Sequence, residues 1–316
     1  MTKVTIYVLS LLSFGIGSVP AADSLDIYLE NGSNQMMRQD YSAALSHFNN
    51  ALRLDPDNSI AIRNLANIHS KLGDLQKSRE FFEKANRKNP NDPEICYNLG
   101  VLYSDLGDST NAVSYYEKAV EFDATNARYL TALGQIYTKI GRVSKAMPML
   151  RRALDSDTAN PIISFFLGNC FAVIGNLDSA EFYYKASMAK GGNAAELYYF
   201  LGSVQRQLGK QAEAIGSFEE AINRDPNHKD YLQSLGLLYL SDQKFEDAAR
   251  QFRLAVKLDS SFYAGWIGLG AACTFDEKTD EANRILEKLF RIDSAIGFQM
   301  IEFVDSERAK QQETED

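Results

Sequence analysis

A period of 34 residues runs through this chain without a gap, and it constrains the fold more than any other feature. When the count begins at Leu25, small residues fill the eighth and twentieth positions, and bulky ones fill the twenty-fourth. Chance cannot keep such columns in register over eight periods, so the chain is a tandem repeat array. The predicted units are 25–58, 59–92, 93–126, 127–160, 161–194, 195–228, 229–262 and 263–296.

The columns predict how each unit folds. Each period carries two segments of about 12 residues with apolar residues at helical spacing, which indicates a pair of helices. Small residues at positions eight and twenty let the two backbones approach, and the bulky residue at position twenty-four fills the space beside them. Glycines such as Gly73 and Gly107 suit a turn with positive φ after the first helix. A single unit cannot bury both faces of its helices, so neighbouring units must stack.

Composition narrows the classes of function. Hydrophobic residues make up 45% and charged residues 24%, which excludes a largely disordered chain. The formal net charge is −9, which argues against a nucleic-acid partner, because such binders are usually basic.

The first 22 residues are typical of a secretory signal peptide. Lys3 precedes an apolar run, and Val19 and Ala21 stand at −3 and −1 of a cleavage site. We expect residues 1–21 to be removed and residues 22–296 to form the array of an exported protein, either periplasmic or secreted. The alternative is an uncleaved anchor, although the run is shorter than the ~20 apolar residues that span a bilayer. No later stretch predicts a membrane span in the mature chain.

Residues with catalytic chemistry are scattered through the array. His47, His69 and His228 lie in different units without partners at metal-ligand spacing, and no phosphate-binding loop or nucleophile motif occurs. His69 takes a packed aromatic column. The cysteines, one in each of three separated units, are expected to be buried and unpaired. The sequence therefore predicts no enzyme, no metal site and no cofactor.

The repeat pattern resembles the tetratricopeptide repeat (TPR) family. The third unit carries the family's motif residues as Leu99, Gly100, Tyr103, Ala112, Tyr116 and Ala119, and the eighth carries the opening Trp as Trp266. The resemblance implies an all-α, right-handed superhelical solenoid of helix-turn-helix repeats. It also implies a scaffold whose partners lie in a concave groove lined by the first helix of each unit.

The resemblance places the groove at positions 2, 5, 6, 9, 12 and 13 of each unit. Polar candidates there are Arg63, Asn64, Asn67, Asn98 and Arg128, and aromatic candidates are Tyr97, Phe165 and Tyr199, with Phe166 and Phe200 beside them. Four of the polar residues match the family's clamp for a peptide carboxylate, while Ala132 stands where the clamp has Arg. An alternative for the two phenylalanines at position 6 is packing against the neighbouring unit.

These observations predict an exported TPR scaffold that binds a protein or peptide in its groove and performs no catalysis. One alternative is a structural assembly subunit of a cell-envelope complex, which would use the outer helices or the ends. Another is a carbohydrate- or peptidoglycan-binding module, since aromatic rings also stack on sugars. The sequence leaves the partner and the oligomeric state open.

The C-terminal segment 297–316 lies beyond the last repeat. Phe298, Ile301 and Val304 fall at helical spacing, and we expect them to cover the end of the array. We expect the charged and polar residues 305–316 to be disordered.

The export hypothesis makes a direct prediction. The purified exported protein should begin at Ala22, because the small residues before it fit the specificity of signal peptidase. N-terminal sequencing or intact mass measures this. Mature material that keeps its N-terminal Met and stays in the membrane fraction would contradict the hypothesis.

Overall fold

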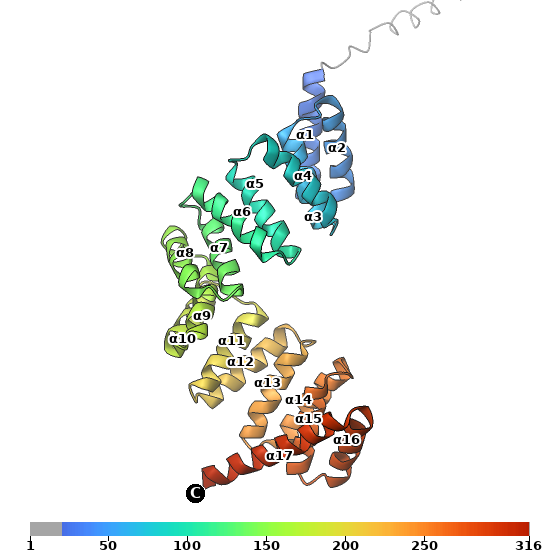
Figure 1. The fold of residues 1–316 in the computed structure, drawn as a ribbon, viewed down its shortest axis with the longest axis vertical. Coiled ribbons are helices and arrows are strands. Elements are labelled where there is room, and N and C mark those ends of the chain that lie inside the picture. Colours follow the sequence, from blue (N-terminus) through green and yellow to red (C-terminus); the bar gives the residue numbers. More distant parts are fainter. Residues whose placement is uncertain (1–20, 316) are drawn as a thin grey trace, which may run out of the picture. The chain divides into compact units, whose positions relative to one another are not determined.

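The computed structural model describes residues 21–315, and within them the fold is all-α, with 17 helices and no strand (Figure 1). From the second unit on, the first helix of each pair begins 34 residues after the one before it, from Ser59 to Tyr263. The helices are α1 (Ala21–Met37), α2 (Tyr41–Leu54), α3 (Ser59–Lys71), α4 (Leu75–Lys88), α5 (Pro93–Asp105), α6 (Ser109–Phe122), α7 (Ala127–Lys139), α8 (Val143–Ser156), α9 (Pro161–Val173), α10 (Leu177–Ala189), α11 (Ala195–Gln207), α12 (Gln211–Arg224), α13 (Lys229–Ser241), α14 (Phe245–Leu258), α15 (Tyr263–Phe275), α16 (Thr279–Ile292) and α17 (Ser294–Glu315). The predicted signal peptide falls almost wholly on residues 1–20, outside the described part.

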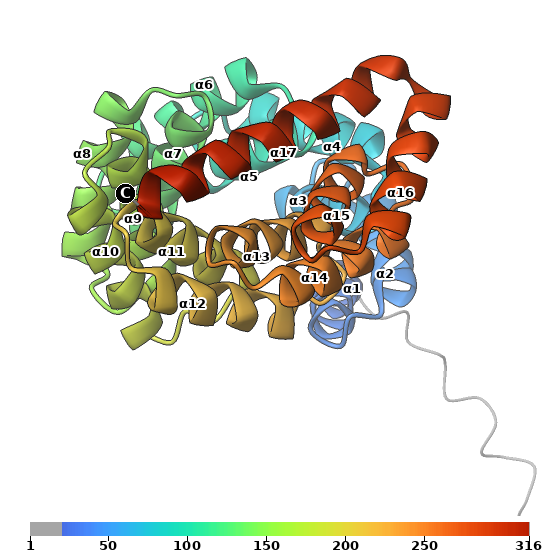
Figure 2. The same cartoon turned by 90° about the horizontal axis from the view of Figure 1, so that it is seen from below.

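The chain divides into two compact parts, Met1–Ile136 and Tyr137–Asp316, with the division inside α7. The first part contains the helix pairs α1/α2, α3/α4 and α5/α6, and the second contains the pairs from α9/α10 to α15/α16, followed by α17 (Figures 1 and 2). The two helices of one unit pack most closely on each other, except in the last unit, where α15 packs more extensively against α14. The unit of this fold is therefore the helix pair that the period predicts.

A tight turn joins the two helices of each unit. The middle one of its three residues has positive φ, between 73° and 78°, in the five units where it is glycine: Gly73, Gly107, Gly141, Gly175 and Gly209. The predicted glycine turn is confirmed there, because residues with a Cβ seldom adopt this conformation. Units one, seven and eight hold it without glycine, at Gln39, Gln243 and Glu277. The next residue is often Asp or Asn, whose side chain caps the second helix, as Asp74 does for the N–H of Lys77.

The position-eight glycine packs against the position-twenty-four aromatic of its own unit. A Cβ built on Gly100 would come within 2.5 Å of the Tyr116 ring, and one on Gly168 would come as close to Tyr184. The same pairing recurs at Gly32, Gly202 and Gly236. The aromatic residues of this column are among the most buried side chains of the protein. The predicted roles of these two columns are confirmed.

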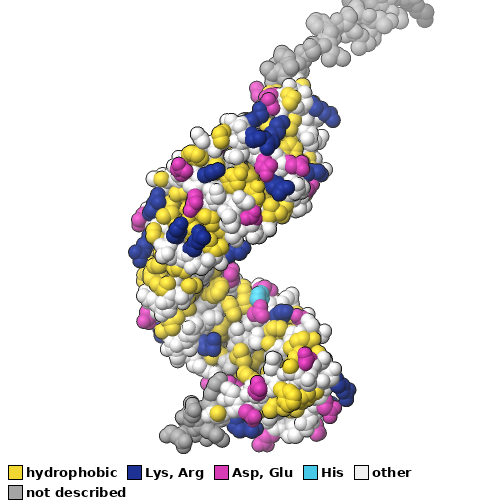
Figure 3. All heavy atoms as spheres, viewed as in Figure 1, with side chains coloured by type: hydrophobic (Ala, Val, Ile, Leu, Met, Phe, Trp, Pro, Cys, Tyr) yellow, Lys and Arg dark blue, Asp and Glu magenta, His cyan; other side chains and the backbone are white. Residues whose placement is uncertain are grey.

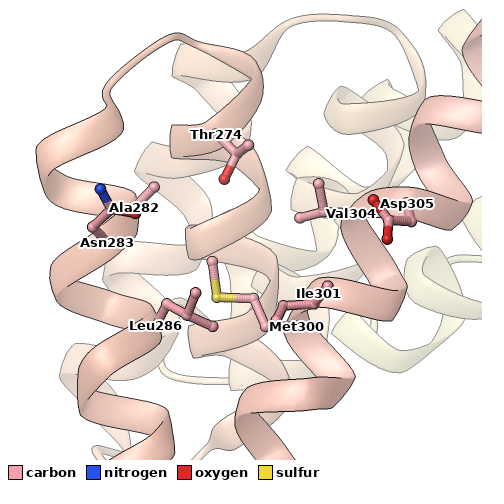
Figure 4. Close-up of a pocket in the computed structure, with 8 residues that line it drawn as sticks. All are labelled: Thr274, Ala282, Asn283, Leu286, Met300, Ile301, Val304 and Asp305. Carbon is pink, nitrogen blue, oxygen red and sulfur yellow. The ribbon is translucent and has the colours of Figure 1, made fainter.

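The last helix covers the end of the array with different residues from those we expected. Val304 is buried, but Phe298 and Ile301 are 57% and 39% exposed, and Met300 is only 4% exposed. Unit eight has Leu286 at position twenty-four (Figure 4). Met300 inserts beside Gly270, where six of the earlier units have an aromatic ring. A longer side chain from α17 thus replaces the missing ring. The fit leaves a cavity of about 190 Å³ between α15, α16 and α17.

The expected disorder of residues 305–316 is also corrected, because α17 continues to Glu315. The stretch has no Gly or Pro after Gly297, and it is rich in Glu, Gln, Lys, Arg and Ala, which have high helix propensity. A charged sequence without helix breakers can extend a helix whose first turns are held by packing.

The covering of the array's end can be tested with two single substitutions. Met300→Ala should lower the free energy of unfolding by about 2–5 kcal/mol, because it empties a buried site. Phe298→Ala should cost less than about 1 kcal/mol, because that ring is mostly exposed. Urea denaturation followed by circular dichroism measures both. A larger loss for Phe298→Ala than for Met300→Ala would contradict this account of the end of the array.

Candidate binding surface

We call the side chains at positions 2, 5, 6, 9, 12 and 13 of each unit the first-helix face. In the first part of the chain it carries all the predicted polar candidates and one aromatic. Their side chains are half-buried, except that of Arg128, which is exposed. The structure places Arg63, Asn64 and Asn67 on α3, Tyr97 and Asn98 on α5, and Arg128 on α7.

The guanidinium of Arg128 is already bound within the protein. It pairs with the carboxylate of Glu94, and its Cζ lies 4.3 Å from the ring centroid of Tyr97 and 5.5 Å from that of Tyr129. The hydroxyl of Tyr129 donates to the same carboxylate at 2.9 Å. The clamp that the sequence suggested would need Arg128 open to a peptide. A carboxylate of the chain itself takes that place, one repeat earlier on α5.

The electrostatics of this cluster agree with its geometry. Burial raises the pKa of Glu94, but hydrogen bonds from Arg128 and Tyr129 outweigh it, so the pKa lies below its usual value. The charge of Arg63 also lowers the pKa of Glu94. Burial and the bond to Glu94 raise the pKa of Tyr129 to about 12. Glu94 is therefore ionised at neutral pH and neutralises much of the positive charge on this side.

The asparagines of this face, Asn67 and Asn98 of the predicted clamp and Asn64 beside them, remain available. The side chains of Asn64, Asn67 and Asn98 are half-buried, and their amides make no hydrogen bond to other described residues. Side-chain amides that are accessible and unpaired can hydrogen-bond to the backbone of an extended peptide, because each offers an acceptor and two donors. This half of the face offers neutral hydrogen-bonding groups rather than an anion clamp.

In the second part of the chain, the aromatic candidates form one continuous cluster, which we call the aromatic strip. Its members are Phe165 and Phe166 on α9 and Tyr199 and Phe200 on α11. The ring centroid of Phe165 lies 5.2 Å from that of Phe166 and 6.0 Å from that of Phe200, and Phe200 lies 5.5 Å from Tyr199. All four side chains are half-buried.

The aromatic strip packs on buried core rings with one side and stays partly accessible on the other. Phe165 contacts the buried ring of Tyr184 at 6.0 Å, and Tyr199 contacts that of Phe218 at 5.8 Å. The alternative for position 6 is thus partly right, because Phe200 packs across to the ring of the preceding unit. The strip keeps an accessible edge on a rigid base, which is how interface anchors are usually built.

Sequence reasoning missed two flanking residues of the strip. Ile162 and Val173, at positions 2 and 13 of unit five, are 53% and 64% exposed. Both lie on α9, which contains no charged residue. The signal was available, because these positions belong to the same face and hold charged residues in several other units.

Packing accounts for His69 and the three cysteines. His69 stacks on Phe81 at 5.7 Å, as a packed histidine should. Cys96, Cys170 and Cys273 are free thiols and buried, as predicted. In residues 21–315 no group of three potential ligands could hold a metal ion, and no helix there is both long and apolar enough to cross a bilayer.

Charge is mixed on the face of the molecule drawn in Figure 3. Acidic and basic side chains alternate there, with hydrophobic patches between them. A strongly basic stripe is typical of nucleic-acid binding, and none gathers on that face.

Comparison with known families agrees with the helix pairs. Four tetratricopeptide repeat models match residues 35–96, 93–126, 131–191 and 195–228, together more than half of the chain. The chain belongs to the tetratricopeptide repeat family. TPR arrays are in general scaffolds without catalytic activity. No curated protein sequence matches the chain.

Solved structures share the fold. PilW, a type IV pilus biogenesis factor, is 24% identical, covers 64% of this chain and 94% of its own, and gives a TM-score of 0.59. A TPR protein from Parabacteroides merdae is 19% identical over 78% of this chain and 98% of its own, with a TM-score of 0.62. A chain of the APC/C hetero-tetramer Cut9-Hcn1 is 15% identical and gives a TM-score of 0.65. The match covers 80% of this chain and 52% of the Cut9-Hcn1 chain.

Proposed function

We propose that this TPR protein is an exported scaffold that binds a protein or peptide partner on its first-helix face and performs no catalysis. The observation that supports this most strongly is the aromatic strip. Four aromatic side chains occupy positions that the core columns do not need, and each keeps an accessible edge. Aromatic side chains on a rigid base supply much of the energy at protein interfaces.

The surroundings of the strip favour a peptide with apolar side chains. Ile162 and Val173 widen it at both ends of α9, and no charge interrupts that helix. The accessible asparagines of the first part suit the backbone amides of the same kind of ligand. A scaffold needs only such contacts, because binding without chemistry requires no perturbed nucleophile or paired acid.

Export is supported by the N-terminal sequence and is compatible with the cysteines. Burial raises the pKa of Cys273 to about 11, so its thiol stays protonated at neutral pH. Cys96 and Cys170 are buried too, and burial raises the pKa of each thiol. Thiols that are buried and protonated tolerate an oxidising compartment without forming disulfides.

A second candidate function is a structural subunit that docks through its second helices. Phe182 on α10 supports it, because this ring is 65% exposed and makes a T-shaped contact with the ring of Tyr183. Single exposed aromatics are common, whereas four in contact are not. We therefore place the main surface on the first helices.

Photo-crosslinking in the native host separates the two candidates. Benzoylphenylalanine should replace Phe166 in one variant and Phe182 in a matched control, since both sites hold an aromatic side chain in the same repeat. We expect a protein adduct from position 166 and little from position 182. Phe165→Ala and Tyr199→Ala should weaken capture about tenfold or more, while thermal unfolding remains cooperative.

Adducts from position 182 alone would overturn the proposal and favour the assembly subunit. An absence of protein adducts at both positions, with binding to a glycan array that Tyr199→Ala abolishes, would favour the carbohydrate-binding alternative.

A further inference from the structure

One side-chain arrangement occurs twice along the first helices, three repeats apart, and combines positions 2 and 5 of the first-helix face with the buried position 3. The first copy is the Arg128 cluster, which we call the occupied cage. Glu94 and Tyr97 stand at positions 2 and 5 of unit three, and Arg128 and Tyr129 stand at positions 2 and 3 of unit four. The guanidinium contacts both rings and pairs with the carboxylate. The chain therefore shows what this arrangement binds: a cation between two tyrosine rings and a glutamate.

The second copy repeats every element except the cation. Glu196 and Tyr199 stand at positions 2 and 5 of unit six, and Tyr231 stands at position 3 of unit seven. Position 2 of unit seven is Asp230, where the occupied cage has arginine. We call this group the open cage. The open cage thus has the carboxylate of Asp230 at the position where the occupied cage has the guanidinium of Arg128.

The aromatic geometry of the two cages is closely matched. The ring centroids of Tyr97 and Tyr129 are 5.2 Å apart at 33°, and those of Tyr199 and Tyr231 are 4.8 Å apart at 28°. Each position-5 tyrosine also lies 5.8 Å from the ring beneath it, at 49° in both copies. The two tyrosines of the open cage therefore keep the mutual arrangement of the two in the occupied cage.

The open cage has no strong cation of its own. Within residues 21–315, Glu196 forms no ion pair, and no Lys or Arg lies over the ring of Tyr199 or Tyr231. The neighbouring Lys229 pairs with Asp259 and lies over Phe262. His228 stacks on Tyr231 at 3.8 Å, with its Nδ1 3.8 Å from the Asp230 carboxylate. Because Tyr231 is buried and His228 covers one of its faces, the half-buried Tyr199 is the ring that an incoming cation can reach.

The local potential is negative and the carboxylates are accessible. Glu196 and Asp230 are both exposed. Burial raises the pKa of Tyr231, and the nearby charges of Glu196, Asp225 and Asp230 raise it further. Two carboxylates beside aromatic rings form an environment that attracts a cation, and an arginine fits it with both its charge and its flat face.

We propose that the open cage binds the guanidinium of an arginine side chain supplied by the partner. This rests on the proposed function, in which the partner lies on the first-helix face. The arginine would stack on Tyr199 and pair with Glu196, as Arg128 does with Tyr97 and Glu94, and Asp230 would add a second acceptor. Because Tyr199 is also a member of the aromatic strip, the partner segment would carry an arginine next to its apolar residues.

The probe for this proposal is N-acetyl-arginine methylamide, and its matched control is the neutral citrulline analogue. Nuclear magnetic resonance of the mature protein with labelled tyrosine rings reports on the cage, and Tyr199→Phe and Tyr231→Phe assign its signals. We expect saturable shifts at Tyr199 and Tyr231 with the arginine compound. We expect at least tenfold weaker binding of the citrulline compound, because it has the shape without the charge.

A reciprocal exchange between the cages sharpens the test. Asp230→Arg should fill the open cage from within and abolish the shifts, while Arg128→Asp should open the first cage and add shifts at Tyr97 and Tyr129. Asp230→Asn, a milder change, should weaken binding several-fold. Circular dichroism melting shows whether each variant remains folded. Equal binding of the citrulline compound, or unchanged binding by folded Asp230→Asn, would overturn the proposal.

Failure of this proposal can be told apart from failure of the proposed function. If Asp230→Arg stays folded and the adduct at position 166 persists undiminished, the partner uses the face without the cage, and only the cage proposal is overturned. If arginine binds the cage as expected and no protein is captured at position 166, the cage proposal is supported and the proposed function is overturned.

Discussion

The close approach of the two helices in each unit is the constraint on which the rest of this structure depends. A small residue at position eight, glycine in seven units and alanine in the second, lets the bulky residue at position twenty-four lie against the backbone of the first helix, as Gly100 does for Tyr116. That contact sets the spacing and rotation of the helix pair. The rotation in turn determines which positions of the first helix face the core and which face outward.

Because a few columns supply the core, the outward positions of the first helices are free to vary in chemistry. The first part of the chain uses position 2 for an internal pair, Glu94 with Arg128. The second part uses the same position for two carboxylates, Glu196 and Asp230. Both cages stand on the same repeat geometry, so a change at one position turns an internal contact into a candidate site for a partner.

The repeat pattern made the fold predictable, because each column has one physical role that recurs in most of the eight units. The turn glycines, the buried aromatic column and the face that carries Tyr97 and Tyr199 follow from it. The pairing of Arg128 with Glu94 does not follow from one unit, because it joins residues 34 positions apart. Aligning the units by position would have exposed it, since Glu94 and Arg128 both occupy position 2.

The C-terminal end was less predictable because it leaves the repeat register. α17 starts at Ser294, three residues before the period would restart, and so presents Met300 rather than Phe298 to the core. A shift of this size rotates a helix by most of a turn. Periodicity alone cannot place a helix that the period no longer governs.

The packing of the position-eight glycine against its ring is the central claim, and native-state hydrogen exchange tests it most directly. It reports the local free energy of opening for each helix pair, which suits an array whose units can open separately. Gly100→Ala should lower that free energy in α5 and α6 by about 1–3 kcal/mol, because the new methyl group meets the Tyr116 ring. Gly216→Ala, on α12 with open space around it, should raise local stability by about 0.5–1 kcal/mol. Equal and stabilising effects of both substitutions would contradict this account.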